Sequence, residues 1–178
     1  DKNNVGKNRK IVCEKISESI SELILINQIH SNKVIEISHK NKTKQMVGDG
    51  LITKEKNLLL GILTADCAPI IFLGKNYVGI IHVGWRGLLN GIIEKTLDLL
   101  QTKGEKSKEL SCFVGTHLQS QNFQVEEDFK ETLIKNKKNN INFLKYKNEK
   151  KFFEFSMFIK YKLSKYNISC ISIINLDT

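Results

Sequence analysis

Residues 60–87 constrain the fold more than any other part of the chain, because they contain all or most of three short apolar runs, at 58–63, 70–73 and 77–83. Each run is bounded by glycine, proline or asparagine and is rich in aliphatic residues, so each predicts a buried β-strand. We therefore expect the chain to be organised around a set of short strands in this region.

Polar and small residues interrupt these runs at two places. Cys67 lies in the insert between the first two runs, and His82 ends the third run directly before the segment Gly84-Trp85-Arg86-Gly87. Side chains at strand ends, beside small residues, can reach a cleft. Pro69, the single proline, fixes its own φ and biases the preceding residue towards an extended geometry, which would orient Cys67. The thiol and the imidazole are therefore candidate site residues.

Apolar periodicity outside this stretch predicts a mixture of helices and strands. Helices are expected at 8–21, 87–100, 125–133 and 153–166, and further strands at 23–26, 33–37, 51–53, 111–114, 141–144 and 168–174. In the first helix, Val12, Ile16 and Ile20 lie on one face. The elements follow no strict βαβ order, which favours an α/β fold with a mixed sheet. With 178 residues and no initiator methionine, the chain is expected to be one domain, 1–178, that is incomplete at both ends.

Composition and charge argue against two classes of partner, specific nucleic acids and membranes. The net charge is +9, but the only arginines are Arg9 and Arg86, and the lysines are scattered among asparagines. Specific readers of nucleic acid depend on the planar arginine fork, so we expect no specific nucleic-acid partner. No apolar run reaches membrane-spanning length and no signal peptide is visible, so we expect a cytoplasmic protein without a membrane partner.

The cysteines are well separated and share no CxxC spacing, so disulfides are not expected. We interpret Cys13, Cys112 and Cys170 as buried free thiols. Among the four histidines, His39 lies in a polar loop where we expect solvent exposure, and His117 is interpreted as a loop residue with its hydrogen bonds satisfied.

Two kinds of chemistry fit the remaining residues. His30, Cys67 and His82 each lie at a predicted strand end, and two imidazoles with one thiolate form a zinc site that keeps one open position. Alternatively, Cys67 is a nucleophile that uses His82 as its base. His30 favours the metal, because a thiol dyad has no need for a second histidine.

Three charged residues near these positions have two interpretations each. Asp49, between two glycines, is a turn residue or a general acid or base, and Asp66 orients a ligand or caps a turn. Arg86, at a helix start, binds an anion such as phosphate or pairs with a local acid.

Several segments, in this order, resemble one known family. The segments are Asn8-Arg9, Gln28-Ile29-His30-Ser31, Gly48-Asp49-Gly50-Leu51-Ile52-Thr53, Leu63-Thr64-Ala65-Asp66-Cys67-Ala68-Pro69, His82-Val83-Gly84-Trp85-Arg86-Gly87 and, more weakly, residues 114–125. They resemble the laccase-domain family, whose members have been labelled polyphenol or multicopper oxidoreductases and are now regarded as purine nucleoside phosphorylases. The resemblance covers nearly the whole chain.

The resemblance implies a function and a set of ligands. The family's zinc ligands fall on His30, Cys67 and His82, and its fold is a three-layer α/β/α sandwich with mixed sheets. Its activity is phosphate-dependent cleavage of adenosine, inosine, guanosine and methylthioadenosine, accompanied by zinc-assisted deamination of adenosine. Purine nucleoside and phosphate are thus the implied partners, and Asp49, Asp66 and Arg86 are the candidates for proton transfer and phosphate binding.

The chain departs from the family's pattern at three places. Ser31 replaces a glycine, Gly115-Thr116 replaces Gly-Pro, and residues 123–125 replace Tyr-Glu-Val. The resemblance also implies an N-terminal strand region and a C-terminal piece, which we expect to lie outside this sequence.

The alternatives are a copper-dependent polyphenol oxidase, a cysteine hydrolase and a metal-binding partner protein without activity. A multicopper oxidase needs many imidazoles, usually in His-x-His pairs, whereas this chain has four histidines and no such pair. Copper binding at the His-Cys-His site itself is still expected to be possible, because copper has the higher intrinsic affinity.

Overall fold

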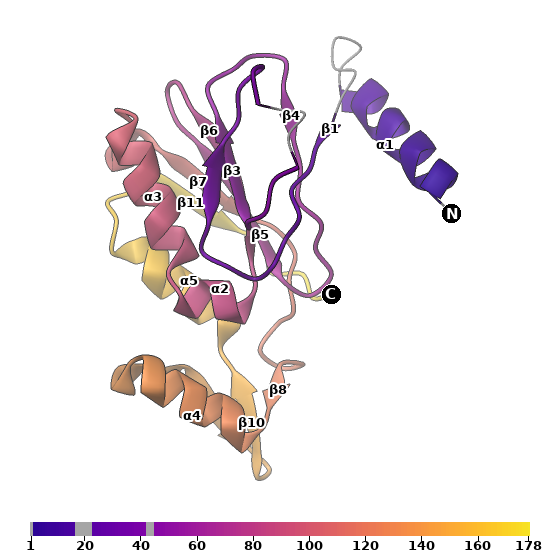
Figure 1. The fold of residues 1–178 in the computed structure, drawn as a ribbon. Coiled ribbons are helices and arrows are strands. Elements are labelled where there is room, and N and C mark those ends of the chain that lie inside the picture. The colour runs from indigo at the N-terminus through magenta and orange to yellow at the C-terminus, as the bar shows by residue number, and fades with distance from the viewer. Residues whose placement is uncertain (1, 17–22, 42–44) are drawn as a thin grey trace.

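A six-stranded mixed sheet forms the centre of the computed structural model, which describes residues 2–16, 23–41 and 45–178 (Figure 1). Its strands are β2 (Val34–Glu36), β3 (Gly50–Thr53), β5 (Ala68–Leu73), β6 (Val78–Val83), β7 (Ser111–Val114) and β11 (Cys170–Ile173), in the order β11-β7-β5-β6-β3-β2. The outer pairs β11/β7 and β2/β3 are parallel, and the inner pairs are antiparallel. The predicted α/β class with a mixed sheet is confirmed.

Helices cover one face of this sheet (Figure 1). They are α2 (Trp85–Leu89), α3 (Ile92–Thr102) and α5 (Phe155–Ser164), and their apolar side chains form the main core with those of the sheet. The single helix predicted at 87–100 is wrong in one respect, because it is divided at Gly91, whose φ of 83° is left-handed. Glycine tolerates this φ, and the chain turns there before α3 begins.

A shorter layer of extended chain lies against the opposite face. Strands β1 (Leu23–Ile24) and β4 (Leu59–Leu60) form a parallel pair, and a small cluster centred on Ile24, Ile37 and Leu51 joins this pair to the sheet. The prediction of a buried strand at 58–63 is therefore wrong: only two residues pair, and Leu63 is 66% exposed. Both edges of β5 are occupied by β6 and β7, so this run cannot pair with the strand that follows it in sequence.

A second, smaller sheet lies beyond the helices (Figure 1). It contains β8 (Gln124–Val125), β9 (Leu144–Lys147) and β10 (Lys150–Phe153), and it is accompanied by α4 (Glu127–Asn136) and the 3-10 helix η2 (Lys138–Phe143). A second 3-10 helix, η1 (Ser107–Glu109), lies in the chain between α3 and β7. The extended segment predicted at 141–144 is wrong, because most of it belongs to η2. Asparagines 139, 140 and 142 favour local turns, and extended structure begins only at Leu144.

The N-terminal helix α1 (Lys2–Ile16) begins earlier than predicted and lies beside β1 (Figure 1). Its predicted apolar face is not buried, since Val12 and Ile16 are 44% and 57% exposed; Ile20 lies outside the described residues. Cys13 and Cys112 are buried as predicted, but Cys170 is exposed because it points to the uncovered side of edge strand β11. No helix in the described part of the chain is long and apolar enough to cross a membrane.

Candidate metal centre

The register of the central strands brings two of the predicted site residues together. In the antiparallel pair β5/β6, Pro69 faces His82, so Cys67, directly before β5, lies close to the end of β6. In the pair β3/β6, Gly50 faces Ile81, and the backbone N–H of His82 donates to the Asp49 carbonyl at 2.7 Å. Residues directly opposite in an antiparallel pair point to the same face, so Asp49 and His82 meet there.

The third residue, His30, is supplied by the loop between β1 and β2. Its φ of 58° is left-handed, which is uncommon for a residue other than glycine. The backbone N–H groups of Ile29, His30 and Ser31 all point to the Asp49 carboxylate, at 3.3, 2.9 and 2.6 Å. Three successive N–H groups form a small anion-binding concavity, which holds the unusual backbone and places the His30 ring over the sheet end.

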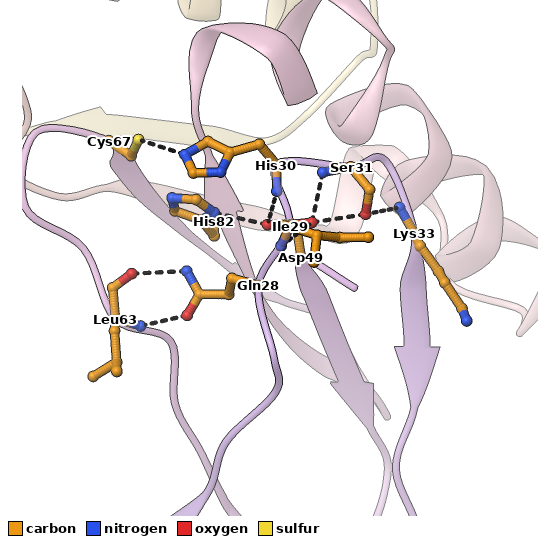
Figure 2. A network of polar contacts seen from close by, with 9 residues as sticks. All are labelled: Gln28, Ile29, His30, Ser31, Lys33, Asp49, Leu63, Cys67 and His82. Atoms are coloured by element: carbon orange, nitrogen blue, oxygen red, sulfur yellow. Dashed lines mark hydrogen bonds and ion pairs between the residues drawn. The ribbon is translucent and has the colours of Figure 1, made fainter. Parts of the chain in front are cut away.

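The three side chains converge on one point (Figure 2). One nitrogen or sulfur atom from each of His30, Cys67 and His82 lies within 4.8 Å of the others, and Cys67 Sγ is 3.9 Å from His30 Nε2. Tetrahedral zinc would hold such atoms about 3.3–3.6 Å apart, so a shift of about 1 Å closes the group around an ion. Among the described residues no fourth histidine, cysteine or acid joins this group.

A glycine provides the space for this convergence. A Cβ atom on Gly84 would lie 2.7 Å from His30 Cδ2 and 3.2 Å from Cys67 Sγ. Its φ of −84° suits any residue, so the requirement for glycine comes from the two candidate ligands and not from the backbone. The site therefore fits a metal ion in its donor types, its spacing and its surroundings.

Asp49 fixes which nitrogen of His82 is free. The two side chains are 0% and 4% exposed, and His82 Nδ1 lies 2.8 Å from Asp49 Oδ1. Burial by itself raises the pKa of Asp49, but hydrogen bonds from His82, Ser31 and Ile29 outweigh it and hold the pKa below its usual value. The ionised carboxylate accepts the Nδ1 proton, so Nε2 presents its lone pair to a metal, an arrangement common behind histidine ligands.

The serine that replaces the family's glycine contributes to the same arrangement. Ser31 Oγ donates to Asp49 Oδ2 at 2.7 Å, in addition to the bond from its backbone N–H. The substitution therefore adds a donor to the carboxylate.

Cys67 is poorly suited to act as a free nucleophile. Burial raises the pKa of its thiol, and the negative charges of Asp66 and Asp49 raise it further. Its hydrogen-bond partner is His30 Nε2, at 3.9 Å. A bound cation would remove this obstacle, since it stabilises the thiolate directly.

Gln28 is a site residue that the sequence reasoning missed. Its side-chain amide donates to the Leu63 carbonyl and accepts from the Leu63 backbone N–H, both at 2.8 Å (Figure 2). This pairing joins the loop of His30 to the segment that leads to Cys67. Its position two residues before His30 was the only hint in the sequence that Gln28 belongs to the site. Its hydrogen-bond partner could not be predicted, because the Leu63 backbone is 35 residues away in sequence.

The other predicted residues surround the centre or lie apart from it. Asp66 is exposed and accepts a hydrogen bond from Thr178, and Arg86 is exposed with its guanidinium 4.2 Å from the Trp85 ring centroid. His39 is exposed as predicted, and His117 is buried with both ring nitrogens in hydrogen bonds.

Comparison with known proteins gives this geometry a family context. A family model described as multi-copper polyphenol oxidoreductase laccase matches residues 1–178. A purine nucleoside phosphorylase of Aquifex aeolicus is 41% identical over 127 residues, which cover 71% of this chain and 57% of that protein. Purine nucleoside phosphorylase RP494 of Rickettsia prowazekii is 28% identical over 161 residues, or 88% of this chain and 66% of that protein.

Solved structures share the fold. The protein YfiH of Bacillus licheniformis superposes with a TM-score of 0.85 at 21% identity, over 96% of this chain and 70% of that one. YlmD of Geobacillus stearothermophilus superposes with a TM-score of 0.84 at 20% identity, over 98% of this chain and 70% of that one. The chain thus spans about three-fifths of the length of the two purine nucleoside phosphorylases and 70% of these two structures.

Proposed function

Because this chain belongs to the multi-copper polyphenol oxidoreductase laccase family, whose similar members are named purine nucleoside phosphorylases, we propose that it takes part in cleaving purine nucleosides with phosphate. The proposed substrates are adenosine, inosine, guanosine and methylthioadenosine, with deamination of adenosine at the same site. The observation that carries the proposal is the convergence of His30, Cys67 and His82.

Zinc is the proposed metal. Two imidazoles and one thiolate are a donor set that zinc binds well, and the open fourth position is typical of catalytic zinc. When bound, zinc supplies a Lewis acid that activates a group placed at that position. Asp49 holds the proton on His82 Nδ1 and thereby keeps Nε2 directed at the site.

Other residues are proposed to handle phosphate and proton transfer. In phosphorolysis a phosphate oxygen attacks the anomeric carbon, the bond to the purine nitrogen breaks, and the purine takes up a proton. The exposed guanidinium of Arg86 offers several N–H groups to the phosphate while it stacks on Trp85. Asp66, exposed beside Cys67, is proposed to relay the proton, whereas the buried Asp49 serves as a positioning residue.

The copper alternative has less support in the chain's own residues. His39 lies near Glu55 and His117 bonds to Gly115 and Ser156, so only two of the four histidines reach the candidate metal centre. A multi-copper cluster requires more imidazoles than these two.

Product analysis tests the proposal. The zinc-loaded protein is incubated with adenosine with and without phosphate, and the products are separated. We expect adenine only when phosphate is present, and inosine in both cases; finding neither product would reject the assignment.

An Arg86→Gln variant separates the two reactions. It should raise the KM for phosphate and leave deamination unchanged. A metal count together with oxygen uptake on a phenolic substrate distinguishes the copper oxidase.

A further inference from the structure

A second group of reactive side chains lies outside the metal centre, between the end of β7 and the start of α5. His117 is fully buried, with Nδ1 2.7 Å from the Gly115 carbonyl oxygen and Nε2 2.6 Å from Ser156 Oγ. A carbonyl oxygen can only accept, so Nδ1 carries the proton in the neutral ring. Nε2 then presents a lone pair, and the Ser156 hydroxyl donates its proton to it.

The competing partner of Ser156 is weaker. Its Oγ lies 3.3 Å from Gln119 Oε1, compared with 2.6 Å from His117 Nε2. The side-chain nitrogen of Gln119 donates to the His117 carbonyl at 3.0 Å, which keeps this amide in place. His117 also packs edge-to-face on Phe155, with ring centroids 5.7 Å apart. The imidazole is therefore held in one orientation beneath the hydroxyl.

Ser156 lies at the wall of a cavity. Ser156 is half-buried and is one of the residues that line a cavity of about 450 Å³; the others are Met157, Lys160, Ser164, Ile171, Ile173 and Asn175. Ser156 is also the second residue of the ten-residue helix α5. The first N–H groups of an α-helix have no intrahelical acceptor, so those of Ser156 and Met157, in the first turn, are available to stabilise a developing oxyanion.

We propose that Ser156 and His117 form a serine nucleophile and its general base, acting on short-chain carboxylic esters. Ser156 Oγ bonds to the ester carbonyl carbon while its proton passes to His117 Nε2. The carbon–oxygen bond to the leaving group breaks, and the alcohol leaves with that proton. Water then attacks the acyl-serine, His117 takes the proton of the water and returns it to Ser156, and the carboxylic acid is released.

The lining of the cavity defines the class of ester. Ile171 and Ile173, both half-buried on β11, and the exposed Met157 provide an apolar wall for a short acyl chain. A volume of about 450 Å³ accommodates a small ester but not a long fatty acyl chain. This activity needs neither metal nor nucleoside, so its success or failure is independent of the function proposed above.

Covalent labelling tests the nucleophile. The whole chain is treated with an uncharged alkyl fluorophosphonate, and the modified peptide is located by mass spectrometry. One label per chain on Ser156 is expected, together with hydrolysis of p-nitrophenyl butyrate that the label abolishes. A folded protein that takes up no label, or takes it up elsewhere, overturns the proposal without any variant.

Matched variants test the roles of the two residues. Ser156→Ala should remove labelling and ester hydrolysis, whereas Ser107→Ala should retain both, because Ser107 is not among the residues that line the cavity and its hydroxyl oxygen accepts a hydrogen bond from Gln101. His117→Gln should slow labelling by about 10²–10⁴-fold, the usual contribution of a general base. His39→Asn, which changes an exposed histidine outside both sites, should leave labelling unchanged. Equal rates of labelling and ester hydrolysis in Ser156→Ala and the unmodified protein would contradict the proposal. Circular dichroism checks that each variant folds.

Discussion

Asp49 organises the candidate metal centre through backbone and side chain together. Its carboxylate accepts hydrogen bonds from His82, from Ser31 Oγ and from three successive backbone N–H groups, although it is completely buried. A buried carboxylate is stable only with such partners, so the loop of His30 and the strand of His82 are held by one anion. The sequence interpretation as a turn residue or an acid–base group did not anticipate this positioning role.

Replacing Asp49 with asparagine should weaken metal binding. Asparagine keeps the shape, but its NH₂ group would face donors, and it lacks the charge that holds the proton on His82 Nδ1. We expect zinc affinity to fall by about 10–100-fold, measured by competition with a chromophoric chelator. Asp128→Asn, in α4, removes a charge away from the site and should bind zinc as the unmodified protein does. Unchanged affinity in Asp49→Asn would refute the positioning role.

Gly84→Ala should affect the metal centre without breaking the backbone. The added Cβ would lie 2.7 Å from His30 Cδ2, closer than unbonded carbon atoms approach, whereas the φ of −84° accepts alanine. We expect a folded protein that retains no zinc by elemental analysis. Gly6→Ala is the control, since no atom lies within 4 Å of its added Cβ. A fully zinc-loaded Gly84→Ala protein would show that the ligands lie elsewhere.

Among the elements, the β5–β6 hairpin brings Cys67, directly before β5, close to His82 on β6. Its turn, residues 74–76, is held by Glu105, which is 3% exposed and follows the end of α3. The carboxylate accepts the backbone N–H groups of Lys75, Asn76 and Tyr77 at 2.8, 2.7 and 2.9 Å. One side chain thus joins the helix layer to the hairpin.

The stability that Glu105 gives to the hairpin should depend on pH. Burial raises the pKa of this carboxyl, but the three backbone donors outweigh it and hold the pKa below its ordinary 4.5. A lowered pKa contributes stability that is complete above pH 4.5 and is lost as the pH falls through the folded value. Glu105→Gln should therefore reduce the free energy of unfolding by about 1.5–3 kcal/mol at pH 7.

Urea denaturation at several pH values measures this effect. The difference between Glu105→Gln and the unmodified protein should shrink as the pH falls below 4.5. Glu109→Gln, which removes an exposed carboxylate 3.5 Å from Lys106, should change stability by no more than about 0.5 kcal/mol. If the difference in the free energy of unfolding between Glu105→Gln and the unmodified protein stays constant from neutral to acid pH, the charge of Glu105 does not stabilise the hairpin.

At the scale of the whole molecule, the sequence predicted what depends on local pattern. Apolar runs located the strands of the main sheet, and the motifs around His30, Cys67 and His82 identified the group that the structure brings together. Contacts between distant segments could not be predicted, such as the pairing of Gln28 with Leu63 and the bond of His117 to Ser156. Within residues 58–63, Leu59 and Leu60 pair with β1 and not with the main sheet, and local patterns do not encode this choice of partner.

The central claim is that His30, Cys67 and His82 together bind one zinc ion and leave one position open. Zinc-edge X-ray absorption of the purified, zinc-loaded protein measures this directly. We predict one zinc per chain, with one sulfur neighbour at about 2.3 Å and two imidazole nitrogens and one further light atom at about 2.0–2.1 Å. A shell with two or more sulfurs, a shell without sulfur, or the same spectrum in Cys67→Ser would contradict it.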